Sequence, residues 1–254
     1  MLSIVIPAYN EARNVGEGSL TRAVEYLSGL GCPYELIVVD DGSEDETPEL
    51  VSEFAKTHPS IRLIRQEHRG KAYAVAGGVS AASGQYVLFM DMDLSTSLEH
   101  LSDAVRELDA GADIVIGSRE APGAVRIGAP FARRWLGKSF NLLVQLLLLP
   151  GLDDTQCGFK AFRAEVAREL FGSLVVFGQP NREVRGPRVT AFDVELLVAA
   201  RKRGNRIAQI PVTWRHVDTR RVRPAAESYR MLREVLSVWL NKVRGRYNLD
   251  HRSP

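Results

Sequence analysis

The stretch Tyr86–Ser95 constrains the fold of this 254-residue chain more than any other segment does. It opens with five apolar or aromatic residues, Tyr86–Met90, and closes on two carboxylates, Asp91 and Asp93, one residue apart. An uninterrupted apolar run of this length is typical of a β-strand that is buried on both faces, as in the middle of a parallel sheet. The two acids then fall at the carboxyl end of the strand, which is where open α/β sheets bind their ligands.

The spacing of Asp91 and Asp93 predicts a shared role. In an extended chain, residues i and i+2 point to the same side, so the two carboxylates would lie close together. Neighbouring carboxylates repel each other unless a positive charge lies between them, and a hard divalent cation that holds phosphate oxygens is the usual partner. The alternative, from this stretch alone, is an ordinary strand end followed by a helix cap at Asp93 or Ser95.

Apolar segments of strand length alternate with segments of helical periodicity along the chain. We expect strands at residues 2–7, 34–40, 61–65, 86–90, 112–117 and 206–214. We expect the longer helices at residues 14–30, 72–82, 131–149, 192–203 and 225–243. Ser43 and Glu46 fit a capping box for a further helix near Pro48. This alternation predicts an α/β fold with a mostly parallel central sheet and helices on both faces.

Polar side chains follow the first four predicted strands at the points where the strands end. Because parallel strands end at one edge of a sheet, these side chains should gather there. They would supply an aromatic face and acceptors for a base and ribose, cations for phosphates and carboxylates for a metal. These are the parts of a nucleotide-diphosphate site, and the residues are Tyr9, Glu11, Asp40, Asp41, Arg69, Lys71, Asp91 and Asp93.

Other phosphate-handling folds fit the sequence less well. A dinucleotide-binding dehydrogenase needs a glycine-rich turn after its first strand, and the turn here, Pro7–Glu11, contains no glycine. A P-loop motif is also absent from the sequence. A haloacid-type phosphatase could use Asp91 as its nucleophile within Asp91–Thr96, but that motif usually lies on the first strand of its domain rather than the fourth.

Five short motifs occur in order along the chain, and together they resemble family 2 glycosyltransferases with the GT-A fold. The motifs are Ile6–Glu11, Val38–Ser43, Arg69–Ala72, Asp91–Leu94 and Ile116–Arg119. The resemblance covers roughly residues 1–240, and within the family it is strongest to the branch that uses polyprenyl phosphates. It implies a GT-A domain at residues 1–224. The basic amphipathic helix and tail at 225–254 would belong to the same domain or contact a membrane surface.

The resemblance implies a binding site for a sugar nucleotide and a metal. Asp91 and Asp93 would bind Mg²⁺ or Mn²⁺, which bridges the donor diphosphate. Ser95 stands where the mannose synthases of the branch carry a glutamine that assists the metal. The residues that would hold the donor are Pro7, Tyr9, Glu11, Val39, Asp41, Lys71, Asp91, Met92, Asp93 and Arg221.

The resemblance also implies which residues handle the acceptor. Arg119 would face the acceptor phosphate with Arg133 beside it, and Asp154 would lie near the reacting carbon. For each the sequence leaves a plainer alternative open: a surface salt bridge for Arg119, a solvated helix face for Arg133, and a turn cap for Asp154. We count Asp93, Arg119 and Asp154 as the catalytic candidates.

Two segments resemble the dolichyl-phosphate β-glucosyltransferases more than the mannose synthases. They are Asp154–Lys160 and Phe192–Leu196. This favours UDP-glucose as the donor, with GDP-mannose as the alternative. A catalytically idle protein that binds a nucleotide sugar or a lipid surface is an alternative of another class. Because a phosphate monoester is already an anion, its attack needs no strong base but needs cations and a metal that neutralise charge.

The net charge of +2 is unevenly distributed along the chain, because residues 201–254 carry 14 Lys and Arg against 4 Asp and Glu. That basic end predicts an anionic partner, and we expect a membrane surface rather than nucleic acid, since interleaved aromatics are lacking. The apolar run Leu142–Leu149 is too short to cross a bilayer but could enter its interface. With only Cys32 and Cys157 and no signal peptide, we expect a protein peripheral to the cytoplasmic face of a membrane.

Overall fold

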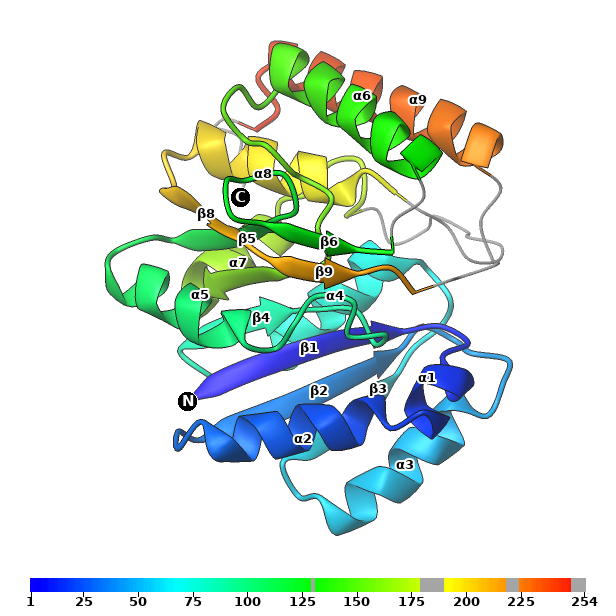
Figure 1. The fold of residues 1–254 in the computed structure, drawn as a ribbon. Coiled ribbons are helices and arrows are strands. Elements are labelled where there is room, and N and C mark those ends of the chain that lie inside the picture. The colour runs from blue at the N-terminus through cyan, green and yellow to red at the C-terminus, as the bar shows by residue number, and fades with distance from the viewer. Residues whose placement is uncertain (129–130, 179–189, 218–223, 248–254) are drawn as a thin grey trace, which may run out of the picture.

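The computed structural model describes residues 1–128, 131–178, 190–217 and 224–247. At its centre lies a seven-stranded sheet with the strand order β3-β2-β1-β4-β7-β5-β8 (Figure 1). Only β7 runs antiparallel to its neighbours in this sheet, which confirms the mostly parallel arrangement. The strands are β1 (Leu2–Ala8), β2 (Tyr34–Asp40), β3 (Ile61–Arg65), β4 (Tyr86–Phe89), β5 (Ile114–Ser118), β7 (Lys160–Arg163) and β8 (Ile207–Pro211).

Helices cover both faces of the sheet, as the alternation predicts. Apolar residues of β1 alternate between the two cores, with Ile4 and Ile6 in one and Val5 in the other. One face is covered by α2 (Ser19–Gly29), α3 (Thr47–Thr57) and α5 (His100–Asp109). The other is covered by α4 (Lys71–Ala81), α7 (Ala164–Phe171) and α8 (Phe192–Lys202). Strands with both faces buried explain why their sequences are apolar without interruption.

Two long helices, α6 (Phe131–Leu147) and α9 (Pro224–Val243), form an outer layer over α8 and run side by side (Figure 1). Val144 of α6 and Val235 and Val238 of α9 are buried in the same core. The Lys242 ammonium donates to the carbonyl oxygen of Leu148 at 3.1 Å and so ties the two helices together. Among the described residues, none of the helices combines the length and the apolar character that a bilayer span requires.

Three local predictions were wrong, each for a local reason. The helix expected at 14–30 is divided into α1 (Ala12–Gly16) and α2, because Gly18 adopts a left-handed φ of 81°. The strand expected at 206–214 is divided into β8 and β9 (Thr213–Arg215), and β9 pairs with β6 (Val125–Ile127). The expected capping box does not form, because the Ser43 hydroxyl instead accepts a hydrogen bond from Asn10.

The carboxyl ends of β1 to β5 meet at one edge of the sheet, which confirms the predicted gathering of strand ends. The antiparallel β7 starts at this edge, so the segment before it also lies there. Strand β9 covers the turn after β4, since the amide of Arg215 donates to the Ser95 carbonyl at 2.7 Å. The site described below is assembled from these connecting segments.

Candidate active site

Asp91 and Asp93 lie in a turn rather than in an extended strand. Strand β4 ends at Phe89, and the Leu94 amide closes the turn by donating to the Asp91 carbonyl at 3.1 Å, with Leu94 at a φ of 51°. The argument from the two-residue period of a strand was therefore wrong in its geometry. The two acids are nevertheless close enough to interact, because the charge of Asp91 raises the pKa of Asp93.

The Lys71 ammonium neutralises part of this acidic pair. It lies at the first residue of α4 and donates to Asp91 Oδ1 at 2.5 Å. Burial alone would lower the pKa of Lys71, but Asp91, Asp193 and Asp93 outweigh that effect and raise it. Lys71 is therefore held as a cation beside the acids, where a phosphate group would also meet it.

Asp93 remains electrostatically unsatisfied despite its hydrogen bonds. Burial, followed by the charge of Asp91, raises its pKa above the usual value, although bonds from Ser95 and the charge of Lys71 act in the opposite direction. The Ser95 amide donates to Asp93 Oδ1 at 2.9 Å, and Ser95 itself is buried. The structure thus places Ser95 as a support for Asp93, and a cation would relieve the remaining repulsion between the acids.

Gly158 packs directly against the Asp91 carboxylate. A Cβ atom built at Gly158 would lie 2.1 Å from Asp91 Oδ2, well inside van der Waals contact. Gly158 belongs to the segment that precedes β7, so this close approach couples that segment to the acid pair. Only glycine leaves room for the Asp91 side chain in this position.

Arg119 and Asp154 form a buried bidentate ion pair. Arg119 Nε donates to Asp154 Oδ2 at 2.6 Å and Nη2 donates to Oδ1 at 2.9 Å, while the Arg119 amide adds a third bond at 3.0 Å. Asp154 is fully buried, and Arg119 keeps 20% of its side-chain surface exposed. The charge of Arg119 lowers the pKa of Asp154 even though burial acts against it. Asp154 therefore acts on Arg119 and also caps its turn through the Gln156 amide.

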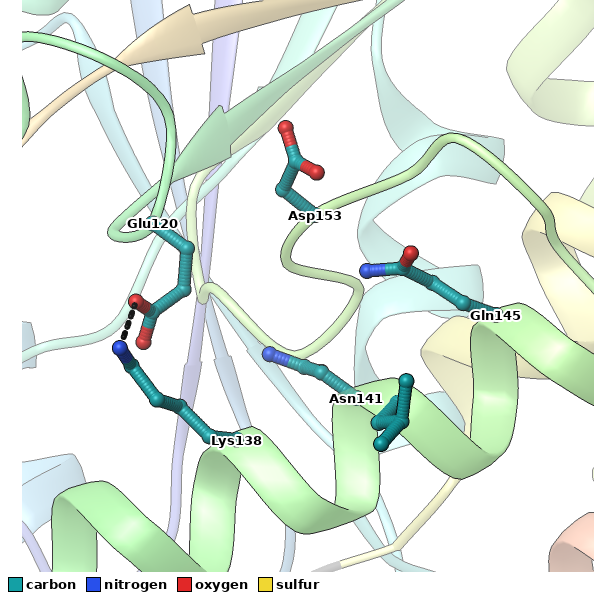
Figure 2. A pocket seen from close by; sticks show the side chains of 6 residues that line it. Glu120, Lys138, Asn141, Gln145 and Asp153 are labelled. Carbon is teal, nitrogen blue, oxygen red and sulfur yellow. Dashed lines mark ion pairs between the residues drawn. The ribbon is translucent and has the colours of Figure 1, made fainter.

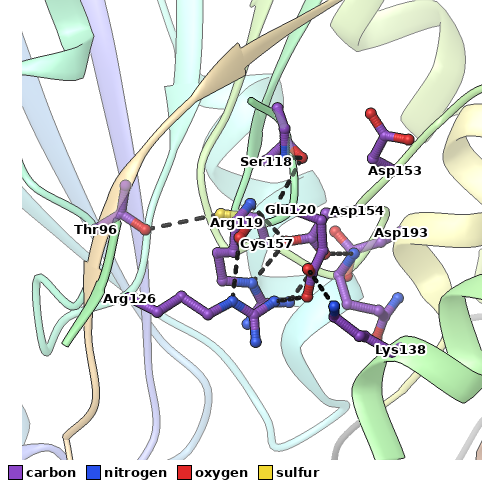
Figure 3. A network of polar contacts seen from close by, with 12 residues as sticks. Thr96, Ser118, Arg119, Glu120, Arg126, Lys138, Asp153, Asp154, Cys157 and Asp193 are labelled. Atoms are coloured by element: carbon purple, nitrogen blue, oxygen red, sulfur yellow. Dashed lines mark hydrogen bonds and ion pairs between the residues drawn. The ribbon is translucent and has the colours of Figure 1, made fainter. Parts of the chain in front are cut away.

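The surroundings of Arg119 are fixed by a polar network, which Figure 3 shows, and by an aromatic ring. The guanidinium lies 5.5 Å from the ring centre of Trp214 on β9, a cation–π distance. Arg126 donates to the Arg119 carbonyl at 3.1 Å and pairs with Glu120. Nη1 of Arg119 has no hydrogen-bond partner among the described residues, so one edge of the fork is left for a ligand anion.

Tyr9 lies at the same edge and stacks on His68 rather than standing alone. The two rings are 4.0 Å apart and within 10° of parallel. His68 Nδ1 is held by the Asp41 carboxylate at 2.8 Å, and the amides of Arg69 and Gly70 also donate to Asp41. Asp41 is buried and orders the loop 68–70. Its predicted contact with a base stays a prediction.

Two predicted donor residues cannot reach a ligand with their side chains. Val39 is fully buried in the core beneath α4. Met92 is buried in the opposite core, where its sulfur accepts a hydrogen bond from Ser19 at 3.3 Å. Any contact of Val39 or Met92 with the donor would have to come from backbone atoms, and their predicted role stays a prediction. Pro7 and Glu11 are partly exposed at the edge, and Glu11 accepts a hydrogen bond from Asn14.

Two further predicted residues fall outside what the structure describes. Arg221 lies among residues 218–223, which are not described. Arg133 lies in the first turn of α6, but its side chain is not among the described ones. Their roles toward donor and acceptor phosphates stay predictions.

Several residues at the site were missed by reading the sequence. Trp214 lies in a segment that was expected to end one longer strand and to have no role in the site. Lys160 is fully buried, donates to Asp193 at 2.5 Å and lies 5.3 Å from the Phe89 ring, behind the acid pair. The apolar neighbours of Lys160 on both sides were the available signal, since a lysine in a buried strand needs a partner charge.

Comparison with known proteins bears on this geometry. Residues 3–171 match the family model "Glycosyl transferase family 2". The chain is 33% identical over 253 residues to a dolichyl-phosphate beta-glucosyltransferase of Dictyostelium discoideum, covering 93% of this chain and 73% of that protein. It is 35% identical to one from Trichomonas vaginalis, covering 85% of this chain and 64% of that protein.

A solved structure supports the fold. Glucosyl-3-phosphoglycerate synthase of Mycobacterium tuberculosis, in complex with Mn²⁺, UDP and glucosyl-3-phosphoglycerate, superposes with a TM-score of 0.64 at 23% identity. The match covers 95% of this chain and 79% of that one, and at this identity it speaks for the fold alone. With the family model and relatives above 30% identity, the conclusion is direct: this chain belongs to glycosyl transferase family 2 and has the GT-A fold.

Proposed function

We propose that this enzyme transfers glucose from UDP-glucose to a polyprenyl phosphate of the dolichyl type, with Mg²⁺ or Mn²⁺ as cofactor. The relatives named as dolichyl-phosphate beta-glucosyltransferases support the sugar and the acceptor. The observation that carries the proposal is the meeting, at one sheet edge, of an acid pair with a cation and an arginine held by a buried carboxylate. The acid pair with Lys71 suits a metal-bound diphosphate, and Arg119 suits an acceptor phosphate.

The acid pair fits a divalent cation by the chemistry of its donors. Asp91 and Asp93 offer hard carboxylate oxygens, and burial together with the neighbouring charge of Asp91 raises the pKa of Asp93. Among the described residues, His, Cys, Asp and Glu form no group of three or more that could hold a metal. Two carboxylates that share the ion with substrate phosphates and water are the arrangement that Mg²⁺ and Mn²⁺ sites of this kind use. When bound, the metal supplies Lewis-acid stabilisation of the leaving diphosphate.

The chain's own residues would hold the two substrates in place. Tyr9 and Glu11 would receive the base and ribose, and Lys71 would meet the donor phosphates. Arg119 would bind the acceptor phosphate through its free Nη1 edge, while Asp154 keeps the guanidinium oriented. Asp154 is thus a positioning residue in this account, because its carboxylate is buried and engaged by Arg119.

The reaction then follows from charge and geometry. An acceptor phosphate oxygen attacks the anomeric carbon, a new C–O bond forms, and the bond from that carbon to the UDP oxygen breaks. UDP leaves with the electron pair of that bond. Because the acceptor phosphate oxygen is already an anion, no proton has to be removed from it beforehand. In-line attack inverts the anomeric carbon, and an α-linked donor gives a β-linked product. Arg119 lowers the repulsion between two anions that must meet.

We also propose that the outer face of α6 and α9 rests on a membrane surface, since the acceptor is a lipid. Large apolar side chains are exposed along both helices, with basic residues among them. This outer face comprises Trp135, Leu142, Leu146, Tyr229, Leu232, Leu236, Trp239, Leu240 and Val243, with Lys138, Arg230, Arg233 and Lys242 beside them. Apolar insertion combined with attraction to anionic lipid is the usual mode of such helices.

A donor screen with an acceptor-site variant tests the function. Purified enzyme is incubated with a polyprenyl phosphate and with UDP-glucose or GDP-mannose, and lipid-linked sugar is extracted and counted. We expect transfer from UDP-glucose; preference for GDP-mannose would move the assignment to the mannose synthases.

Arg119→Ala should raise the KM for the lipid phosphate while leaving the Kd for UDP nearly unchanged. Equal losses in both would reassign Arg119 to the donor, and binding of UDP without transfer of any sugar would favour an idle binding protein.

A further inference from the structure

A small cavity lies beside the Arg119–Asp154 pair, between α6 and the loops that carry Glu120 and Asp153. It has a volume of about 170 Å³, well below that of a drug-sized site. Glu120 follows Arg119 in the chain and Asp153 precedes Asp154, so the cavity adjoins the proposed acceptor site. Figure 2 shows its lining residues, which are Glu120, Lys138, Asn141, Leu142, Gln145 and Asp153.

The buried amide oxygen of Asn141 is unsatisfied in this cavity. Asn141 is only 6% exposed, and its Oδ1 makes no hydrogen bond with the residues that the structure describes. Gln145 lies one helical turn further along α6, and its amide likewise makes no hydrogen bond within the described part of the chain. Side chains four residues apart share a helix face, and Figure 2 shows both amides directed from α6 into the cavity. A buried amide without a partner is costly unless a ligand or water satisfies it.

The remaining walls favour a neutral ligand over an anion. Lys138 Nζ lies 3.8 Å from Glu120 Oε2, and Glu120 also pairs with Arg126. The Asp153 carboxylate has neither a hydrogen bond nor an ion pair with the residues that the structure describes. Glu120 already engages both nearby cations, Lys138 and Arg126, so the Asp153 carboxylate is left to disfavour a phosphate. Leu142 adds an apolar wall.

We propose that this cavity is a binding site for a neutral polyhydroxylated ring of monosaccharide size. Each sugar hydroxyl both donates and accepts a hydrogen bond, which matches the two amides and the Asp153 carboxylate, while Leu142 can contact the C–H face of the ring. Such a ring could come from a free saccharide or from the sugar of a glycosylated lipid held at the adjoining acceptor site. This site is separate from the donor edge and goes beyond the transfer reaction proposed above.

Saturation-transfer NMR with the full chain tests the proposal. Methyl β-D-glucopyranoside is the free probe. Its spectra are recorded with excess UDP and Mg²⁺, and without Mn²⁺, so that the donor edge is occupied. Glucosyl polyprenyl phosphate in detergent micelles is the lipid-linked probe. Asn141→Leu and Gln145→Ala should each weaken binding of a responding probe by about tenfold, the loss expected for one or two hydrogen bonds. Ser139→Ala, an exposed residue on the same helix, is the matched control and should leave binding unchanged.

The two probes distinguish the source of the ring. A response of both probes that depends on Asn141 and Gln145 means that free saccharides enter, and a response of the lipid probe alone assigns the cavity to lipid-linked sugar. If neither probe responds, or if neither variant changes the response, the cavity holds solvent only and the proposal is overturned. If Asn141→Leu fails to fold, the binding measured with Gln145→Ala alone decides between these outcomes. UDP affinity, measured in parallel, reports on the proposed function independently.

Discussion

At the scale of single residues, the Asp154 carboxylate is expected to have a large effect on stability. Asp154→Asn leaves the Arg119 guanidinium partly buried without its counter-charge, and breaking such a pair costs about 3 kcal/mol of unfolding free energy. Urea unfolding at neutral pH measures this loss. Asp153→Asn, which removes a carboxylate that holds no partner, is the matched control and should stay within about 0.5 kcal/mol of the wild type.

The same carboxylate predicts a dependence on pH. Because the pKa of folded Asp154 lies below its ordinary value of 3.8, its ionised form stabilises the fold above pH 3.8, and this contribution is lost as the pH falls toward the folded pKa. The difference in unfolding free energy between wild type and Asp154→Asn should therefore shrink as the pH is lowered below 3.8. A difference that stays constant would show that the ion pair does not depend on this ionisation.

Gly158 offers a test of the acid pair that leaves both acids in place. Gly158→Ala would bring a methyl group to 2.1 Å from Asp91 Oδ2 and must displace that carboxylate. We expect Mn²⁺ affinity, followed by electron paramagnetic resonance, to fall by more than tenfold. Gly29→Ala, where nothing lies within 4 Å of the added methyl, should bind Mn²⁺ normally. Normal binding by Gly158→Ala would remove Asp91 from the metal site.

At the scale of elements, Glu195 of α8 connects distant parts of the chain. Its carboxylate accepts hydrogen bonds from the amides of Val175, Val176 and Phe177, and the Tyr247 hydroxyl after α9 donates to Oε1 at 2.8 Å. Burial raises the pKa of Glu195 above its ordinary value. The C-terminal end of the outer layer is thereby tied to the segment that follows α7.

This connection predicts a change in local dynamics. Tyr247→Phe removes one hydrogen bond to Glu195 and should lower the unfolding free energy by about 1 to 2 kcal/mol. Hydrogen exchange at the amides of Val175–Phe177 should accelerate in the same variant. Tyr34→Phe is the control and should change neither quantity, because within the described ranges the Tyr34 hydroxyl bonds only to the exposed Ser28, at 3.0 Å. Unchanged exchange in Tyr247→Phe would mean that α9 and this segment are independent.

Apolar patterning was sufficient to predict most elements, and the failures have local causes. Strands buried on both faces have no polar alternation, so their apolar runs locate β1, β2 and β4 closely. The break at Gly18 depends on a backbone angle that many glycines in helical sequences do not adopt. The division between β8 and β9 depends on pairing with β6, a contact between distant segments that periodicity does not encode.

The site was predictable to the level of which strand ends meet, but not to the direction of each side chain. Lys71, after β3, meets Asp91, after β4, because both strands end at the same edge of the sheet, although β2 and β1 lie between them. The side chains of Val39 and Met92 are buried in the core, because position next to a site does not determine which face a side chain occupies. The partner of Arg119 could not be deduced without the fold, since Asp154 is 35 residues away in the chain.

At the scale of the whole molecule, the basic and apolar outer face of α6 and α9 predicts binding to anionic vesicles that weakens with salt. Deleting α9 is a poor test, because Val235 and Val238 belong to the core. Leu146→Gln and Leu240→Gln change exposed side chains only, and each should weaken co-sedimentation by about tenfold. Val125→Gln, exposed on β6, should bind as the wild type does. If Leu146→Gln and Leu240→Gln bind the vesicles as well as Val125→Gln does, the outer face of α6 and α9 is not the membrane contact.

The central claim is that the acid pair and Arg119 together move glucose onto a lipid phosphate. The most direct test incubates the purified chain with radiolabelled UDP-glucose and a polyprenyl phosphate, with Mg²⁺ or Mn²⁺ or with a chelator, and compares Asp93→Asn. The account predicts β-linked glucosyl lipid that needs a divalent cation and falls by at least a hundredfold in Asp93→Asn. Glucosyl transfer that proceeds equally with the chelator, or in Asp93→Asn, would contradict it.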